Sequence, residues 1–402
     1  MKIDLMRKID FWVGIPVCFI LSFFYNIERI FIRQKTAVHK KILFICISEM
    51  GSTILAYSAI KKLKELYPSS ELYFLIFDEL KDSLNLFDLI SKQNILTLRH
   101  NSFITFVRDS FSFFVRARKE KIDTIIDLEL FARNSNILSY LSGAKTRVGF
   151  YKYLMEGLYK GNMQTHKVHY NPHMHISLNY LSLVYALKYP KDIPLTKIPL
   201  ALADVEIPRV LSSIGEKRRI IEKLKLINPE IDENKNIVIL NPNASELIPI
   251  RKWPLKNYCE LAKKILQRNA YIVITGVNSE KKDALEICQS VNYNERCIDF
   301  TGKTTIKELI DLYNVSKIII TNDSGPNHFA SLTPIKIIVF FGPETPKIYG
   351  TLSPNAAIFY SNFACSPCVS AFNHRRTPCR DNKCLQVIKV DDVFEVVKRE
   401  LK

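Results

Sequence analysis

The chain has 402 residues, of which 47% are hydrophobic and 24% charged, a globular composition in a chain too long for one core. Its formal net charge of +17 is spread along the sequence, which favours anionic ligands and an anionic membrane surface as partners. With only 12 glycines the chain contains no G-x-G-x-x-G fingerprint, Walker loop or nucleic-acid-binding signature, so we predict no nucleic-acid partner.

The N-terminal region combines an uncharged run, residues 11–25 (FWVGIPVCFILSFFY), with basic flanks on both sides. The run is shorter than the roughly 20 residues that cross a bilayer, and no small-residue cleavage site follows it. We therefore predict that residues 1–39 form a membrane-associating helix that lies in the lipid interface. A helix packed on the protein and a true membrane span are the alternatives.

Residues 40–200 show a first alternation of apolar strands and helices. Predicted strands are 41–47, 71–77, 95–98, 124–128 and 147–150, and the predicted helices include 54–66 and 102–119, the second with an aromatic face. Strands that alternate with helices predict a parallel, doubly wound sheet. We expect this segment to be one Rossmann-like domain.

Residues 201–235 are predicted to be a linker that contains a charged helix, and residues 236–402 repeat the α/β alternation. Predicted strands in this second part are 237–240, 271–275, 297–300, 318–320 and 336–341. The fold class is therefore α/β, with two Rossmann-like doubly wound domains and an N-terminal hydrophobic helix.

The stretch 318–330 (IIITNDSGPNHFA) reads as a strand, a tight loop and the start of a helix. Pro326 suits the first helical turn, where its missing N–H costs nothing. Free backbone N–H groups at a helix start attract phosphate, while Ser324 adds a hydroxyl and Gly325 allows close approach. The stretch predicts a phosphate site at the carboxyl end of a parallel strand. An ordinary capped turn is the alternative.

Three groups of segments, taken in order and spacing, resemble glycosyltransferase family 9, the ADP-heptose lipopolysaccharide heptosyltransferases. They are ILFICISEMGSTILA (42–56), NPNAS (241–245) with RKWP (251–254), and NDSGPNHFASL (322–332) with VFFGP (339–343). The similarity extends from about residue 40 to 390.

This resemblance implies a GT-B architecture, in which two Rossmann-like domains face a cleft. It also implies inverting transfer of a sugar, heptose from ADP-heptose, to a lipopolysaccharide-type or other glycolipid acceptor without a catalytic metal or other required cofactor. The acceptor would bind the N-terminal half and the nucleotide sugar the C-terminal half, in a cytoplasmic enzyme peripheral on the inner face of the cytoplasmic membrane. A nucleotide-sugar-binding relative without catalysis and a sugar-nucleotide epimerase are the alternatives.

The departing diphosphate needs charge stabilisation, which backbone amides and basic side chains can supply. Together with the resemblance, this gives a predicted donor site that consists of Asn243, Ser245, Arg251, Lys252, Glu280, Asp323, Ser324, Gly325 and His328. The family position at Glu280 holds the nucleotide ribose, although Glu280 could instead cap a helix. Asp323 could instead hold the loop through backbone hydrogen bonds.

The general base is the point at which this sequence departs from the family. Well-known heptosyltransferases carry an aspartate directly after the glycine of the first motif, but here Ser52 follows Gly51. A serine alone cannot take a proton at neutral pH, so we assign catalysis to Glu49, the nearest carboxylate, with Ser52 orienting the acceptor. A solvent-facing charge is the other interpretation of Glu49.

Four of the nine cysteines are clustered as Cys365-x2-Cys368-x10-Cys379-x4-Cys384. A C-x2-C pair with two further thiolates can form a tetrahedral structural zinc site. Free thiols, a disulfide and an iron–sulfur site are the alternatives. The remaining cysteines lie singly in apolar or helical contexts, which indicates a reducing compartment.

Overall fold

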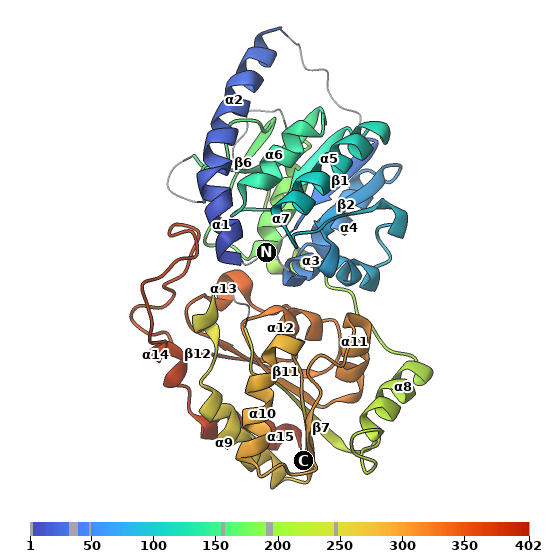
Figure 1. Cartoon of the computed structure of the whole chain (residues 1–402), viewed down its shortest axis with the longest axis vertical. Coiled ribbons are helices and arrows are strands. Elements are labelled where there is room, and N and C mark those ends of the chain that lie inside the picture. The colour runs from blue at the N-terminus through green and yellow to red at the C-terminus, as the bar shows by residue number, and fades with distance from the viewer. Residues whose placement is uncertain are drawn as a thin grey trace. The chain divides into compact units, whose positions relative to one another are not determined.

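The computed structural model describes residues 3–31, 39–47, 50–153, 157–189, 196–244 and 248–401. It divides into two compact units (Figure 1). Unit 1 contains Met1–Glu206 and Ala371–Arg375, and unit 2 contains Ile207–Ser370 and Arg376–Lys402. The division at Glu206 falls inside the stretch predicted to be a linker.

Unit 1 is built on a six-stranded parallel sheet of order β3-β2-β1-β4-β5-β6. The strands are β1 Lys41–Ile45, β2 Glu71–Phe77, β3 Ile95–Leu98, β4 Thr124–Asp127, β5 Thr146–Tyr151 and β6 His166–His169. The central strands are almost wholly buried, as expected for a parallel sheet covered on both faces. The predicted doubly wound sheet is confirmed, with β6 as an additional edge strand.

The helices of unit 1 are α1 Ile3–Trp12, α2 Gly14–Phe31, α3 Met50–Leu55, α4 Tyr57–Leu66, α5 Phe103–Lys119, α6 Arg133–Leu141 and α7 Ile176–Ala186. Short 3-10 segments lie at Asp78–Leu86, Lys92–Asn94 and Leu202–Asp204. Helix α6 packs against β4 and β5, and it also contacts α1, α2 and α5.

The N-terminal helices α1 and α2 are packed on the rest of unit 1 along one side only. The buried residues of α2 are Gly14, Cys18, Ser22 and Tyr25, which recur every three or four residues and so share one face. Cys18 and Tyr25 form a small core with Met163, and burial raises the pKa of the Cys18 thiol to about 11. The segment Leu5–Phe31 is long and apolar enough to cross a membrane by length and composition.

Unit 2 contains a second six-stranded parallel sheet, of order β12-β11-β10-β7-β8-β9. Its strands are β7 Asn236–Asn241, β8 Ala270–Ile274, β9 Cys297–Asp299, β10 Ile318–Asn322, β11 Lys336–Phe341 and β12 Ala356–Tyr360. This sheet confirms the second predicted doubly wound domain.

The helices of unit 2 are α8 Ile214–Lys225, α9 Leu255–Leu266, α10 Lys281–Ser290, α11 Ile306–Val315, α12 Gly325–Ala330, α13 Pro346–Tyr349, α14 Lys383–Gln386 and α15 Val390–Glu400. Two 3-10 turns, η4 Pro249–Arg251 and η5 Asn278–Glu280, lie beside the strand ends. Trp253 stacks on Phe340 with ring centroids 4.4 Å apart, and this pair fixes the start of α9 on the sheet.

Each sheet has one point at which consecutive connections leave in opposite directions. In unit 1 this switch point lies between β1 and β4, and in unit 2 it lies between β7 and β10. Ligands of open α/β sheets bind outside the carboxyl ends of the strands at such a point. These two strand ends are therefore where a functional site is expected.

Candidate functional site

The predicted donor residues of unit 2 lie around the carboxyl ends of β7 and β10. Asn243 follows β7, whereas Asp323 and Ser324 follow β10, and the two strands are parallel neighbours. The topology thus brings together segments that are about 80 residues apart in the sequence, as expected at a switch point.

Asn322, the last residue of β10, fixes the segment that follows β7. Its Nδ2 donates to the carbonyl oxygens of Pro242 at 2.9 Å and Asn243 at 3.1 Å, and its Oδ1 accepts from the Trp253 N–H at 2.8 Å. Because Asn322 is fully buried, these bonds lock the start and the end of the connection between β7 and α9. The predicted site residue Ser245 belongs to this connection but lies outside the described residues.

Arg251 lies buried in a charge cluster with two buried carboxylates. Its Nη1 is 3.1 Å from Glu344 Oε2 and 3.4 Å from Asp323 Oδ2. The structure therefore brings together two predicted site residues, Arg251 and Asp323, and adds Glu344, which the sequence analysis did not select. Glu344 directly follows the VFFGP segment at the end of β11. Its position just after a strand could have identified it as a candidate site residue.

Lys252, whose side chain is 38% exposed, forms a second group with the buried Asn243. Lys252 Nζ is 3.0 Å from Asp283 Oδ2 and 3.5 Å from Asn243 Oδ1. Gly276 lies beside them, since a side chain there would meet Glu280 Oε2 and Asn243 Nδ2 within about 3 Å. Glu280 Oε2 accepts from the Val277 N–H at 2.8 Å, so its carboxylate caps its own 3-10 turn.

The turn between β10 and α12 leaves backbone open on one side. Ser324 is the N-cap of α12, and its Oγ donates to the Asn322 carbonyl at 3.2 Å. A Cβ atom added to Gly325 would have no heavy atom within 4 Å among its described surroundings. His328 is buried in α12. The space beside the Gly325 Cα, on the side where a Cβ would point, is therefore open.

The two predicted catalytic residues lie in the first connection of unit 1. Ser52 is half-buried in α3, where its carbonyl accepts from the Ala56 N–H at 2.9 Å. Glu49 lies outside the described residues. The last described residue before it is Ile47, which is buried two residues after the end of β1.

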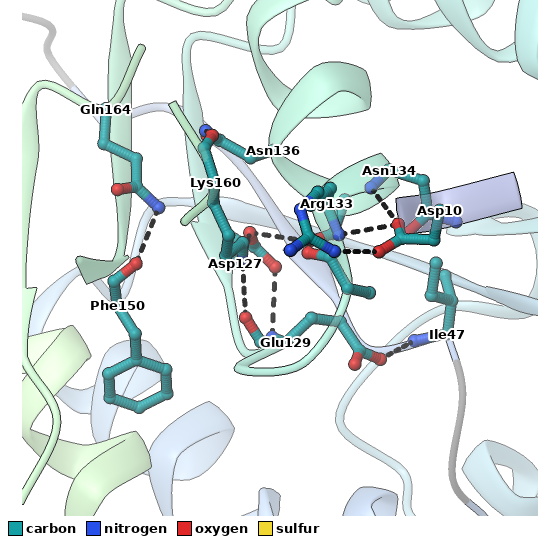
Figure 2. Close-up of polar contacts among 12 residues, drawn as sticks. Asp10, Ile47, Asp127, Glu129, Arg133, Asn134, Asn136, Phe150, Lys160 and Gln164 are labelled. Carbon is teal, nitrogen blue, oxygen red and sulfur yellow. Dashed lines mark hydrogen bonds and ion pairs between the residues drawn. The ribbon is translucent and has the colours of Figure 1, made fainter. Parts of the chain in front are cut away.

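A polar network that sequence reasoning missed occupies the switch point of unit 1 (Figure 2). Asp127, the last residue of β4, pairs with Lys160 at 2.7 Å, and both side chains are about 2% exposed or less. Asp127 also accepts from Ser135 Oγ at 2.8 Å and from the Glu129 N–H at 3.0 Å. Lys160 Nζ further donates to the Glu129 carbonyl.

This network reaches the first connection through Glu129. Glu129 Oε1 accepts a hydrogen bond of 2.7 Å from the Ile47 N–H, two residues before Glu49. A charge-assisted bond of this kind is among the stronger ones in a protein interior. The network therefore anchors the end of β1, from which the predicted catalytic segment continues.

The structural zinc site predicted for the cysteine cluster is not supported. No disulfide joins any of the nine cysteines, all of which are described, and within the described ranges no group of three or more His, Cys, Asp or Glu side chains is arranged to hold a metal ion. Cys365 is exposed, whereas Cys384 is buried in the core of unit 2, where burial raises the pKa of its thiol to about 11. Sequence spacing alone does not fix these different environments.

Asn382, near the end of the cysteine segment, instead forms hydrogen bonds with the backbone of the predicted donor site. Asn382 Nδ2 donates to the carbonyl oxygens of Ile250 at 2.9 Å and Lys252 at 2.7 Å. The C-terminal segment thereby holds the backbone on either side of Arg251.

Two doubly wound parallel sheets in one chain, each with polar residues at its switch point, are typical of the GT-B class of glycosyltransferases. The family description "Glycosyltransferase family 9 (heptosyltransferase)" matches residues 111–376, more than half of the chain, and the protein belongs to this family. The resemblance found in the sequence is thereby confirmed.

Individual relatives agree with this assignment. The chain is 31% identical over 183 residues to lipooligosaccharide heptosyltransferase 2 of Campylobacter jejuni, a match that covers 44% of this chain and 55% of the relative. It is 24% identical over 327 residues to the enzyme of the same name from Haemophilus ducreyi, a match that covers 79% of this chain and 88% of the relative. The chain thus aligns with about half the length of the Campylobacter relative and with most of the Haemophilus one.

Two solved structures have the same fold. The E. coli ADP-heptose LPS heptosyltransferase II has a TM-score of 0.71 and 19% identity, with 90% of this chain and 98% of that chain covered. A glycosyl transferase of family 9 from Veillonella parvula has a TM-score of 0.68 and 17% identity, with 92% of this chain and 99% of that chain covered.

Proposed function

We propose that this protein transfers heptose from ADP-heptose to a lipopolysaccharide-type acceptor with inversion at the anomeric carbon. Family membership and the names of the relatives support this activity. The observation that carries the proposal is the open backbone at Gly325, at the start of α12 and at the switch point of unit 2. A diphosphate fits there because helix-start amides favour negative charge.

In this proposal the donor binds unit 2. The amides of Ser324 and Gly325 receive the diphosphate, and Lys252 adds positive charge from the partly exposed group beside Asn243. Arg251 is held in place by Asp323 and Glu344. Two buried carboxylates fix its guanidinium in advance, so that its N–H groups would donate to the departing phosphate without reorganisation.

The remaining proposed donor contacts are made by residues that follow the strands of the same sheet. Glu280 would hold the nucleotide ribose; its carboxylate lies against Gly276, where an added Cβ would come within 2.7 Å of Glu280 Oε2. His328 and Ser245 complete the proposed binding residues.

The chemical step joins the acceptor oxygen to the anomeric carbon while the bond from that carbon to the diphosphate breaks. The proton of the acceptor hydroxyl passes to a general base, for which we propose Glu49 with Ser52 orienting the hydroxyl. The negative charge gained by the leaving diphosphate is stabilised by protein groups, so the proposed mechanism uses no metal ion.

We further propose that the protein is peripheral on the cytoplasmic membrane, with α2 lying in the lipid interface. One face of α2 is packed on unit 1, and the opposite face is apolar and exposed. A spanning helix would need lipid on the side that Cys18 and Tyr25 use for protein contacts. This arrangement supports the predicted interfacial position of the helix over the alternative of a membrane span.

Product analysis tests the proposed activity. Purified full-length protein would be incubated with ADP-heptose, with a panel of other nucleotide sugars, and with extracted glycolipid, and products would be identified by mass spectrometry. A mass increase of one heptose on the glycolipid, with release of ADP, is the expected result. Donor binding without transfer would favour a binding protein, and conversion of the free nucleotide sugar would favour an epimerase.

A further inference from the structure

Helix α5 carries a second apolar stripe on its exposed face. Its exposed large side chains include Ile104, Val107, Phe111 and Val115, which recur every three or four residues and so line one side of the helix. The buried residues Phe113 and Ala117 lie on a different side. Helix α5 therefore packs on unit 1 with one face and presents another apolar face outward, which a soluble surface helix does not require.

Helix α2 has the same organisation. Its exposed large side chains are Phe19, Ile20, Phe23, Phe24, Ile27, Ile30 and Phe31. At helical spacing they lie opposite to the face formed by Gly14, Cys18 and Tyr25. Both helices thus leave aromatic and aliphatic side chains in solvent.

The two stripes flank one helix on the same side of the sheet. Right-handed crossovers from β3 to β4 and from β4 to β5 place α5 and α6 on the same face of the sheet. At the end of α6, Tyr140 contacts Tyr25 and Glu28 of α2, while the next carbonyl, Leu141, accepts from Arg118 of α5. Figure 1 shows α6 between α2 and α5.

We propose that the exposed stripes of α2 and α5 form one composite membrane-docking surface for an anionic phospholipid bilayer. The proposal rests on the peripheral membrane association stated above and extends it from the N-terminal helix to the body of unit 1. Two separate apolar contacts fix the orientation of a domain on a bilayer, whereas a single helix allows rotation about its axis.

The charges around the two stripes fit an anionic bilayer. The exposed basic residues of α2 and α5 are Arg29, Arg108, Arg116, Arg118 and Lys119, and Lys8 of the neighbouring α1 is also exposed. The acidic side chains of α2 and α5 are engaged, since Asp109 pairs with Arg99 and Glu28 accepts from Tyr140. Asp10 of α1 pairs with Arg133. Basic residues beside aromatic ones bind anionic headgroups. A second copy would instead bring two basic surfaces together.

The test is co-sedimentation of the full-length protein with phosphatidylglycerol–phosphatidylethanolamine vesicles. The α5 variant is Ile104→Ser with Phe111→Ser, and the control is Ile214→Ser with Leu211→Ser in unit 2. The pairs are matched in exposure, with Ile104 and Ile214 at 80% and 81% and Phe111 and Leu211 at 68% and 69%. We expect vesicle affinity to fall by roughly tenfold or more in the α5 variant and to stay at the wild-type value in the control.

A third variant, Phe19→Ser with Phe23→Ser in α2, separates the two proposals. If the α2 variant loses affinity while the α5 variant binds as wild type does, the composite surface is wrong and α2 alone contacts lipid. If neither variant loses affinity, membrane docking itself is wrong, although the transferase proposal stands because the vesicles contain neither donor nor acceptor. A wild-type dimer in light scattering that the α5 variant dissociates would also overturn the proposal.

Discussion

Asp10 of α1 and the start of α6 at Arg133 form a contact that joins the N-terminal helices to the rest of unit 1. Asp10 Oδ1 accepts from the Arg133 N–H at 2.8 Å and from the Asn134 N–H at 3.1 Å, and Oδ2 accepts from Arg133 Nη1 at 2.9 Å. The N-cap residue of α6, Ala132, provides no side-chain cap. The start of α6 is therefore capped by a residue 123 positions earlier in the sequence.

We expect Asp10→Ala to lower the free energy of unfolding by about 2–4 kcal/mol, because a helix cap is lost and a buried arginine loses its partner. Asp10→Asn should cost less, since its amide oxygen can still accept from the two backbone N–H groups. Urea unfolding of the three proteins measures both differences. Equal stability of Asp10→Ala and wild type would show that this cap is not formed in solution.

The buried pair of Lys160 and Asp127 gives a second stability prediction. Lys160→Met should destabilise the protein by roughly 3–5 kcal/mol, because it leaves a carboxylate buried without its counter-charge. The double variant with Asp127→Asn should recover part of this loss, since no unpaired charge remains. Thermal unfolding of the wild type and of the two variants measures both changes in stability.

The matched control for this pair is an exposed ion pair of the same unit. Lys61 pairs with Glu206, and the two side chains are 37% and 57% exposed. Lys61→Met should change stability by only about 0–1 kcal/mol. If Lys61→Met and Lys160→Met had equal effects, burial would not be what makes the Lys160 pair important.

Most of the fold could be predicted from the sequence because apolar runs such as those of β1 and β10 are continuous and separated by helical segments. Strand β6 could not, since its sequence HKVH is polar and the strand forms only by pairing with β5 at the sheet edge. The hydrophobic periodicity of a sequence indicates which segments are buried. An edge strand such as β6 forms because a neighbouring strand pairs with it, and its own sequence does not show this.

The polar contacts of the sites were less predictable than the sheets. Sequence motifs selected Arg251 and Asp323, but their buried partner Glu344 lies 93 residues from Arg251. The Lys160–Asp127 pair likewise joins residues 33 positions apart. Such pairs depend on which strand ends the topology brings together, which local spacing does not encode. The cysteine spacing likewise does not encode which of the four thiols is exposed and which is buried.

The donor site can be tested at Gly325. Gly325→Val should abolish close approach of the diphosphate and reduce ADP-heptose affinity at least tenfold, while stability changes little because a Cβ there meets no neighbour. Isothermal titration calorimetry and thermal unfolding measure the two quantities.

Gly215 offers a matched control in the same unit. It also lies in the first turn of a helix, α8, and an added Cβ also meets nothing within 4 Å. Gly215→Val should therefore leave donor affinity unchanged. Equal affinity of Gly325→Val and Gly215→Val would remove the β10–α12 turn from the donor site.

The identity of the general base gives the last prediction. If Glu49 takes the acceptor proton, Glu49→Gln should reduce turnover by roughly 10²–10⁴-fold, the range expected for loss of a general base, with donor affinity intact. Ser52→Ala should cost much less, because a hydroxyl can orient the acceptor but cannot hold its proton at neutral pH. Steady-state kinetics with glycolipid acceptor, combined with calorimetry of donor binding, separates the two roles. Turnover at the wild-type level in both variants would place the base elsewhere, with His328 as the next residue to replace.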